Sequence, residues 1–254
     1  MEATQTTRRP AAARRRAERA ERILAAATEL VLRWGYDKTT IDDVARLAGV
    51  AKGTIYLHWS SREELFAALM RWDRAQMIGA VRRELRDHPE TATLPGLFGH
   101  LAREIHRRPL LQAALVQDSA VLGKLVARKR TSTTTPEMVV PFGEYLATLG
   151  KHSMARADLN VEDHLTVIAA VLHGSLFSLR MMPDSLRVSD ERTGELVADM
   201  LVRALAPERE PSEADRVVCA DATRQFVDRA YAIARAKLRE SLGDDLPPDE
   251  GEPS

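Results

Sequence analysis

Apolar residues recur at spacings of three and four along most of this chain, which is the period of a helix with one buried face. No segment alternates between apolar and polar residues as a half-buried strand does, and aromatic residues make up only 5% of the 254 positions. We therefore expect an all-α protein. The pattern predicts helices over 17–34, 42–48, 52–58, 61–85, 94–107, 109–128, 136–149, 161–181, 190–205 and 213–242.

The order of these segments predicts two helical domains with extensions at both ends. We expect a small N-terminal domain over 17–60 and a larger antiparallel helical domain over 61–206. A linker bounded by Pro207 and Pro211 precedes an extra C-terminal helix, which we assign to 207–243. Residues 1–16 are predicted to form a disordered basic arm, and 244–254 a disordered acidic tail.

The residue counts exclude several classes of protein. Cys219 is the single cysteine, so the chain has neither an intrachain disulfide nor a site of several thiolates. The seven histidines include no i,i+4 pair, which argues against a metal site. The longest uncharged stretch, 165–179, is too short to cross a bilayer, and no apolar segment follows the basic N-terminal residues. We expect a cytoplasmic protein with no cofactor, no metal and no membrane partner.

Charge is distributed unevenly although the formal net charge is zero. Residues 1–62 carry 12 Lys/Arg against 7 Asp/Glu, whereas the remainder carries 25 against 30. A basic N-terminal end on an acidic body favours a polyanionic partner, with chance clustering of arginines as the alternative.

The N-terminal segment has the spacing of a helix-turn-helix. Ala45 provides the small residue where two helices touch, and Gly49 follows four positions later in the turn. Thr40 with Asp43 forms a potential capping pair for the first of these helices. Apolar residues fall where they would hold the pair together: Ile41, Val44, Ala48, Val50 and Ile55. The second helix of such a unit enters the major groove of DNA.

Residues 39–65 (TTIDDVARLAGVAKGTIYLHWSSREEL) resemble the TetR family of bacterial transcriptional regulators, and the resemblance covers about residues 20–66. Trp59 replaces the usual phenylalanine, Arg62 the usual lysine and Ala51 a common serine. The first two changes keep the chemistry of an apolar plug and a cation. The third removes one polar group at the start of the recognition helix.

The predicted DNA contacts divide into two kinds. Side chains at the start of the recognition helix reach base edges, and this set comprises Lys52, Gly53, Thr54 and Leu57. Donors suited to phosphate oxygens fix the register, and this set comprises Thr40, Tyr56, His58 and Arg62. Arg14, Arg15 and Arg16 form a possible DNA arm, and a solvated tail is the equal alternative. Outside the motif, Tyr56 and His58 would be interpreted as packing residues.

The resemblance implies that the larger domain binds a ligand and forms a homodimer through 161–181 and 190–205, with core burial within one subunit as the alternative. Candidate pocket residues are aromatic or semi-polar, and core packing is the stronger reading for each: Phe98, Phe142, Tyr145, His173 and Phe177. A small apolar or amphipathic organic ligand would suit such a site.

The leading interpretation is a homodimeric repressor that a small ligand releases from a palindromic operator on double-stranded DNA. The alternative is a DNA-bound interaction protein controlled by a protein partner. An enzyme is disfavoured, because the sequence contains no GxGxxG, P-loop, HExxH or GxSxG motif.

Overall fold

The computed structural model describes residues 8–123, 136–156, 158–205 and 212–242, and these ranges contain helices and no strand. The elements are α2 (Arg8–Trp34), α3 (Ile41–Ala48), α4 (Lys52–Tyr56), α5 (Arg62–Asp87), η1 (Pro89–Thr91), α6 (Leu94–His106), α7 (Pro109–Leu115), α8 (Ser119–Leu122), α10 (Pro136–Lys151), α11 (Val161–Met181), η2 (Asp184–Leu186), α12 (Asp190–Leu205) and α13 (Glu213–Leu242). The prediction of an all-α fold is confirmed.

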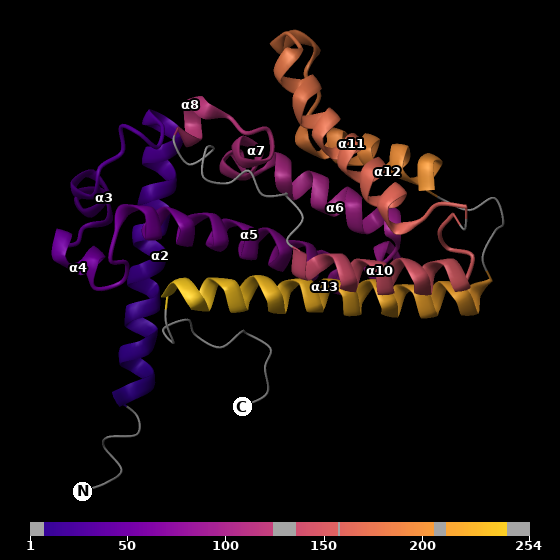
Figure 1. Cartoon of the computed structure of the whole chain (residues 1–254), viewed down its shortest axis with the longest axis horizontal. Coiled ribbons are helices and arrows are strands. Elements are labelled where there is room, and N and C mark those ends of the chain that lie inside the picture. Colours follow the sequence, from indigo (N-terminus) through magenta and orange to yellow (C-terminus); the bar gives the residue numbers. More distant parts are fainter. Residues whose placement is uncertain (1–7, 124–135, 157, 206–211, 243–254) are drawn as a thin grey trace, which may run out of the picture.

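The N-terminal domain consists of α2, α3 and α4, and it lies at one end of the molecule (Figure 1). Its core is built from the predicted apolar face of α2, where Ile23 and Leu24 are fully buried. Val44 of α3 and Ile55 of α4 complete this core, and the start of α5 closes it. Burial of these side chains fixes the orientation of the short helices α3 and α4.

Helix α2 is longer than the sequence pattern predicted. It begins at Arg8, so residues 8–16, which we expected to be disordered, are helical. Alanine and arginine dominate this stretch and have high helix propensity, while Pro10 lies in the first turn, where a missing N–H costs no helical hydrogen bond. Trp34, the last residue of the helix, is 39% exposed.

The remaining helices form an elongated body in which α13 runs antiparallel to α5 and also packs against α10 (Figure 1). On the other side, α12 packs closely on α6, and α11 lies against α12. Cys219 and Val227 of α13 are buried in the core of the body. Leu238 and Leu242, near the end of the same helix, are buried in the core of the N-terminal domain. One helix therefore belongs to both cores.

The predicted helix 109–128 is divided into α7 and α8 in the structure. Gln117 has a φ of 52° between them, a left-handed conformation that ends the first helix. Residues 124–128 lie outside the described ranges. Within the part of the chain that the structure describes, no helix is long and apolar enough to cross a membrane.

Candidate nucleic-acid interface

Local hydrogen bonds fix both the start of α3 and the turn between α3 and α4. The Thr40 hydroxyl accepts a hydrogen bond from the backbone N–H of Asp43 at 3.2 Å, and the Asp43 carboxylate accepts from the Thr40 N–H, which forms the predicted capping box. Gly49 ends α3 with a φ of 65°, a conformation that favours glycine. The Val50 N–H then donates to the Ala45 carbonyl at 3.0 Å, which directs the chain into α4.

Helix α4 has one buried side and one open side. Ile55 is fully buried and Trp59, just beyond the helix, is 2% exposed, so both anchor the segment to the domain core. Lys52 and Gly53 at its start are exposed, as is Leu57, which is 73% exposed at its end. An exposed leucine costs hydration free energy unless a partner covers it. Three of the four predicted base contacts thus face solvent together, and Thr54 is half-buried beside them.

Lys52 is paired with an acidic side chain of the preceding helix. Its ammonium lies 2.8 Å from the Asp42 carboxylate, and this hydrogen bond and the negative charge raise the pKa of Lys52. Both side chains are largely exposed, so the pair is weak and open to exchange. The sequence motif did not predict this pair, which must open if Lys52 is to donate to a base edge.

The four predicted phosphate contacts have different surroundings. Thr40 is exposed, and Tyr56 is 47% exposed with its ring at the surface. His58 is half-buried, and its ring lies against Trp59 with centroids 5.3 Å apart. These three residues remain predicted phosphate contacts.

Arg62 makes contacts within the domain that the sequence did not predict. Its guanidinium donates to the Thr39 carbonyl at 3.0 Å and to the Tyr36 carbonyl. It also lies over the Tyr36 ring, 3.9 Å from the centroid. The side chain is half-buried and joins α5 to the segment before α3. These contacts give Arg62 a structural role, and its phosphate contact stays a prediction.

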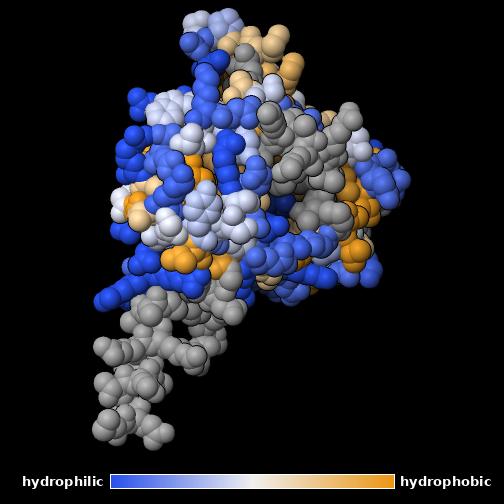
Figure 2. Space-filling model, turned by 60° about the vertical axis from the view of Figure 1, so that its left-hand side comes forward, coloured by the Kyte–Doolittle hydropathy of each residue, from blue (hydrophilic) through white to orange (hydrophobic). Residues whose placement is uncertain are grey.

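The N-terminal part of α2 lies beside the recognition helix. Arg16 donates a hydrogen bond to the Leu57 carbonyl at 3.3 Å, which places this part of α2 next to the exposed end of α4. Arg14 is exposed and forms an ion pair with Glu18 at 3.4 Å, while Arg15 is exposed on the adjoining turn. Figure 2 shows this end of the molecule from outside, where hydrophilic residues cover most of the surface.

The predicted pocket residues are only partly brought together. Phe142 lies 6.3 Å from both Phe98 and Tyr145 between ring centroids, so these three form one buried cluster. Phe226 of α13 stacks on Tyr145 at 4.9 Å and was missed, because α13 was treated as an appendage. The other two candidates lie on α11, where His173 is half-buried and Phe177 is 61% exposed.

Buried polar groups fix the geometry of this aromatic cluster. The Tyr145 hydroxyl lies 3.0 Å from the Thr223 hydroxyl, which itself donates to the Cys219 carbonyl. Burial raises the pKa of Tyr145, so the phenol stays neutral. Burial also raises the pKa of the Cys219 thiol, which disfavours the reactive thiolate. Among the described residues, no group of three or more His, Cys, Asp or Glu side chains is arranged to hold a metal ion.

Residues 23–69 match the model of the family described as bacterial regulatory proteins, tetR family. This match covers α3 and α4 with the helices that hold them, which are the elements that carry the exposed Lys52 and Leu57. The N-terminal domain of this chain is a TetR-family DNA-binding domain. The resemblance inferred from the sequence is thereby confirmed, and the curated relatives described below are named as transcriptional regulators.

Curated relatives match mainly through the N-terminal part of the chain. The chain is 36% identical over 90 residues to the uncharacterized HTH-type transcriptional regulator YhgD of Bacillus subtilis, which is 35% of this chain and 42% of that protein. It is 35% identical over 85 residues to the HTH-type transcriptional activator FasR of Mycolicibacterium smegmatis, which is 31% of this chain and 39% of that protein. It is 30% identical over 114 residues to the DNA-binding transcriptional repressor TetR of Mycobacteroides abscessus, which is 38% of this chain and 57% of that protein. The chain thus spans about half the length of these relatives or less.

Solved structures extend the likeness to the fold of the larger domain. A putative tetR family transcription regulator from Shewanella sp. PV-4 aligns with a TM-score of 0.51 at 17% identity, covering 74% of this chain and 98% of that one. A gamma-butyrolactone receptor described as an ArpA-like protein aligns at 0.50 and 19% identity, covering 85% and 98%. At these identities the likeness shows a shared fold and no shared ligand.

Proposed function

We propose that this chain is a homodimeric transcriptional repressor that binds a pseudo-palindromic operator and is released from it by a small apolar or amphipathic ligand. The observation that carries the proposal is the open side of α4, where Lys52, Gly53 and Leu57 face solvent on a helix anchored by Ile55 and Trp59. A helix anchored by one side and open on the other suits insertion into the major groove.

Each exposed residue of α4 suits a different feature of the groove. Lys52 can donate to guanine O6 or N7 once it leaves Asp42, and Leu57 can pack on a thymine methyl. The absence of a side chain at Gly53 lets the helix approach the base pairs closely. Tyr56 presents a hydroxyl group that can donate to a phosphate, and Thr40 can do so once its hydroxyl leaves the Asp43 carboxylate, to which it donates at 2.6 Å.

Apolar residues on the hairpin of α11 and α12 support the homodimer. Phe177 and Met181 of α11 are more than half exposed, and Met200 of α12 is 50% exposed. Figure 1 shows this hairpin projecting from the body, and Figure 2 shows apolar residues at its tip. Val197 and Leu201 of α12 are buried against the body, so the two sides of α12 differ. A second copy would cover the exposed side.

The ligand would act through contacts between the body and the N-terminal domain. The Tyr36 N–H, in the turn between α2 and α3, donates to the Val121 carbonyl of α8 at 2.8 Å. Leu110 and Leu122 of α7 and α8 are buried in the N-terminal core. A ligand that prefers one arrangement of α7 and α8 would therefore change the spacing of the two recognition helices, by no more than its differential affinity.

The test is selection of bound duplexes from a random pool by the full chain at about 50 mM salt, because phosphate-dominated binding weakens steeply with salt. We expect an enriched pseudo-palindrome with half-sites about one helical turn apart. Lys52→Ala should weaken binding to that site about 5- to 150-fold and should spare non-specific duplexes. Lys151→Ala, which removes the same charge from the end of α10, is the matched control. Equal losses on all duplexes would refute base contact by Lys52.

A further inference from the structure

The C-terminal helix ends beside the N-terminal domain. Leu238 and Leu242 in its last turns are buried in the core shared with α2 and α5. Ser241 accepts a hydrogen bond from Arg71 of α5. The end of α13 at Leu242 therefore lies next to the α5 turn that contains Arg71 and its neighbour Trp72.

A cavity of about 570 Å³, open to solvent, lies at this place between α2 and α5. Trp72 and Ala25 provide its apolar surface, and charged residues of α2 surround them: Arg15, Glu18, Arg19, Glu21 and Arg22. The Trp72 Nε1–H is buried and has no hydrogen-bond partner among the residues that the structure describes. Because buried donors are rarely left unpaired, this group points to an acceptor supplied from elsewhere.

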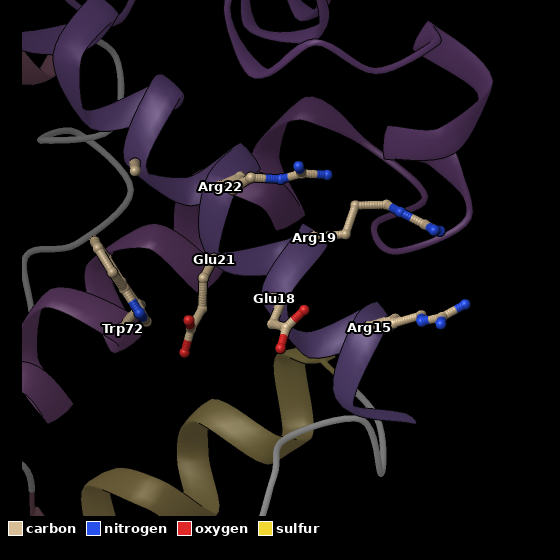
Figure 3. Close-up of a pocket in the computed structure, with 7 residues that line it drawn as sticks. Arg15, Glu18, Arg19, Glu21, Arg22 and Trp72 are labelled. Carbon is tan, nitrogen blue, oxygen red and sulfur yellow. The ribbon is translucent and has the colours of Figure 1, made fainter. Parts of the chain in front are cut away.

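The arginines of this cavity are available to an anionic partner. Figure 3 shows Arg15, Arg19 and Arg22 extending to the same side of α2, with Trp72 and Glu21 on the other side. In the described ranges these three arginines have no carboxylate within ion-pair distance, whereas Glu18 is already paired with Arg14. The cavity thus combines an apolar surface and a buried unpaired donor at Trp72 with unpaired cations on the other side of α2, and the Glu21 carboxylate lies on the Trp72 side.

The twelve residues after α13 have the complementary composition. Residues 243–254 read GDDLPPDEGEPS, with five acidic side chains and no basic one. A short apolar stretch, 246–248, has two aspartates before it and an Asp–Glu pair after it. Proline lacks an N–H and favours extended backbone whose carbonyls are free acceptors, and such segments bind aromatic-lined grooves.

We propose that this C-terminal segment binds the cavity of its own chain. Leu246 and the two prolines cover Trp72 and Ala25, and a backbone carbonyl accepts the hydrogen bond of the Trp72 Nε1–H. The flanking carboxylates pair with the unpaired arginines of α2. Twelve residues reach at most about 40 Å, and the segment starts beside the cavity, so the same chain can supply it.

Binding of the segment would lower the affinity for DNA, and this consequence rests on the proposed function. Arg16 places this part of α2 beside the end of the recognition helix, so carboxylates held on α2 would repel DNA phosphates. A segment bound nine-tenths of the time would lower the DNA affinity about tenfold. Added salt would weaken the effect, because exposed charges are screened.

The first experiment measures binding of the segment without DNA. A full-length variant with Leu246→Ser and with Asp244, Asp245 and Asp249 changed to Asn leaves the cavity open for a labelled peptide of residues 243–254. We expect the peptide to bind by fluorescence anisotropy at about 50 mM salt, and to bind at least tenfold more weakly after Trp72→Phe or Arg19→Gln. Arg19 is only half-buried, so that variant tests the site even if the Trp72 variant is misfolded. Equal binding of a scrambled peptide, or no binding, would overturn the proposal.

The second experiment measures DNA affinity with and without the acidic segment. The same full-length variant should bind DNA about tenfold more tightly than the unchanged chain at low salt. The matched control neutralises three acidic residues far from the cavity by Asp87→Asn, Glu90→Gln and Glu162→Gln, and we expect a smaller gain. Equal gains would overturn the effect on DNA. If neither chain binds any duplex, the proposed function fails while the peptide result still decides the docking. If the unchanged chain competes with the labelled peptide only at high protein concentration, its segment binds a second copy, and this result would overturn docking in the same chain.

Discussion

Substitution of Leu238 by alanine tests whether α13 is an integral part of the N-terminal core. The side chain is 1% exposed and lies in a cluster with residues of α2, α3 and α5. Removal of three methyl or methylene groups from such a site costs about 2–5 kcal/mol, depending on how far the cavity collapses. Leu238 is four residues from the end of α13, where the helix can shift, so we expect a value near the lower half of this range.

The corresponding change in thermal stability is easily measured. A loss of roughly 3 kcal/mol in a chain of this size lowers the melting temperature by roughly 6–12 °C. Calorimetry or circular dichroism at one fixed protein concentration would record it, because the proposed dimerisation would also contribute to stability. Val217→Ala is the matched control, since Val217 lies on the same helix and is 55% exposed. That variant should change the free energy of unfolding by about 0.5 kcal/mol or less.

Two results would refute this reasoning. A Leu238→Ala melting temperature equal to that of the Val217→Ala variant would show that the end of α13 adds nothing to the core. The expected fall in melting temperature together with unchanged amide hydrogen exchange in α2 would show that the end of α13 stabilises the body and not the N-terminal domain.

Three further predictions follow from individual side chains. Arg62→Gln should lower the free energy of unfolding by about 1–3 kcal/mol, because the uncharged amide cannot bond both backbone carbonyls and cover the Tyr36 ring. Although this change removes a cation, we expect the salt slope of DNA binding to stay the same, and a slope reduced by about one would show a phosphate contact. Asp42→Asn should tighten DNA binding at about 50 mM salt, because it frees Lys52 and removes a negative charge, and an affinity equal to that of the unchanged chain at this salt would contradict the prediction. His100 is buried, and burial first and the Arg103 charge second lower its pKa, so the stability that its neutral form contributes should be lost as the pH falls below about 6.5. His100→Gln should flatten the melting temperature between pH 7 and 5.5, and an unchanged slope would assign that loss to other groups.

Helix positions were predictable wherever the sequence carries both an apolar period and an end signal. The range 161–181 was predicted to the residue, and the structure shows why: Asn160 and Asp163 form a capping box at its start. The extension of α2 to Arg8 was missed because residues 8–16 are rich in alanine and arginine without an apolar face. Helix propensity alone supports that stretch, and the periodicity of apolar residues does not report it.

The candidate site was predictable in position but not in side-chain partners. The motif placed Lys52 and Leu57 on the open side of α4, and the structure exposes both. The inward turn of Arg62 depends on Tyr36, which lies 26 positions away in sequence and meets it only after folding. The pair of Lys52 with Asp42 likewise joins two helices. Spacing rules describe one helix at a time, so such contacts between helices escape them.

The position of α13 limits how a ligand in the body can affect the N-terminal domain. Phe226 stacks on Tyr145 in the aromatic cluster, and Leu238, twelve residues later and about 18 Å along the same helix, is buried in the N-terminal core. A helix anchored at both points cannot let the two domains swing independently without exposing one of these side chains. A ligand that displaces Phe226 must therefore move α13 as a unit or release its end from α2. In either case the buried contact of Leu238 changes, so Leu238→Ala should alter the response of DNA binding to the ligand as well as the stability.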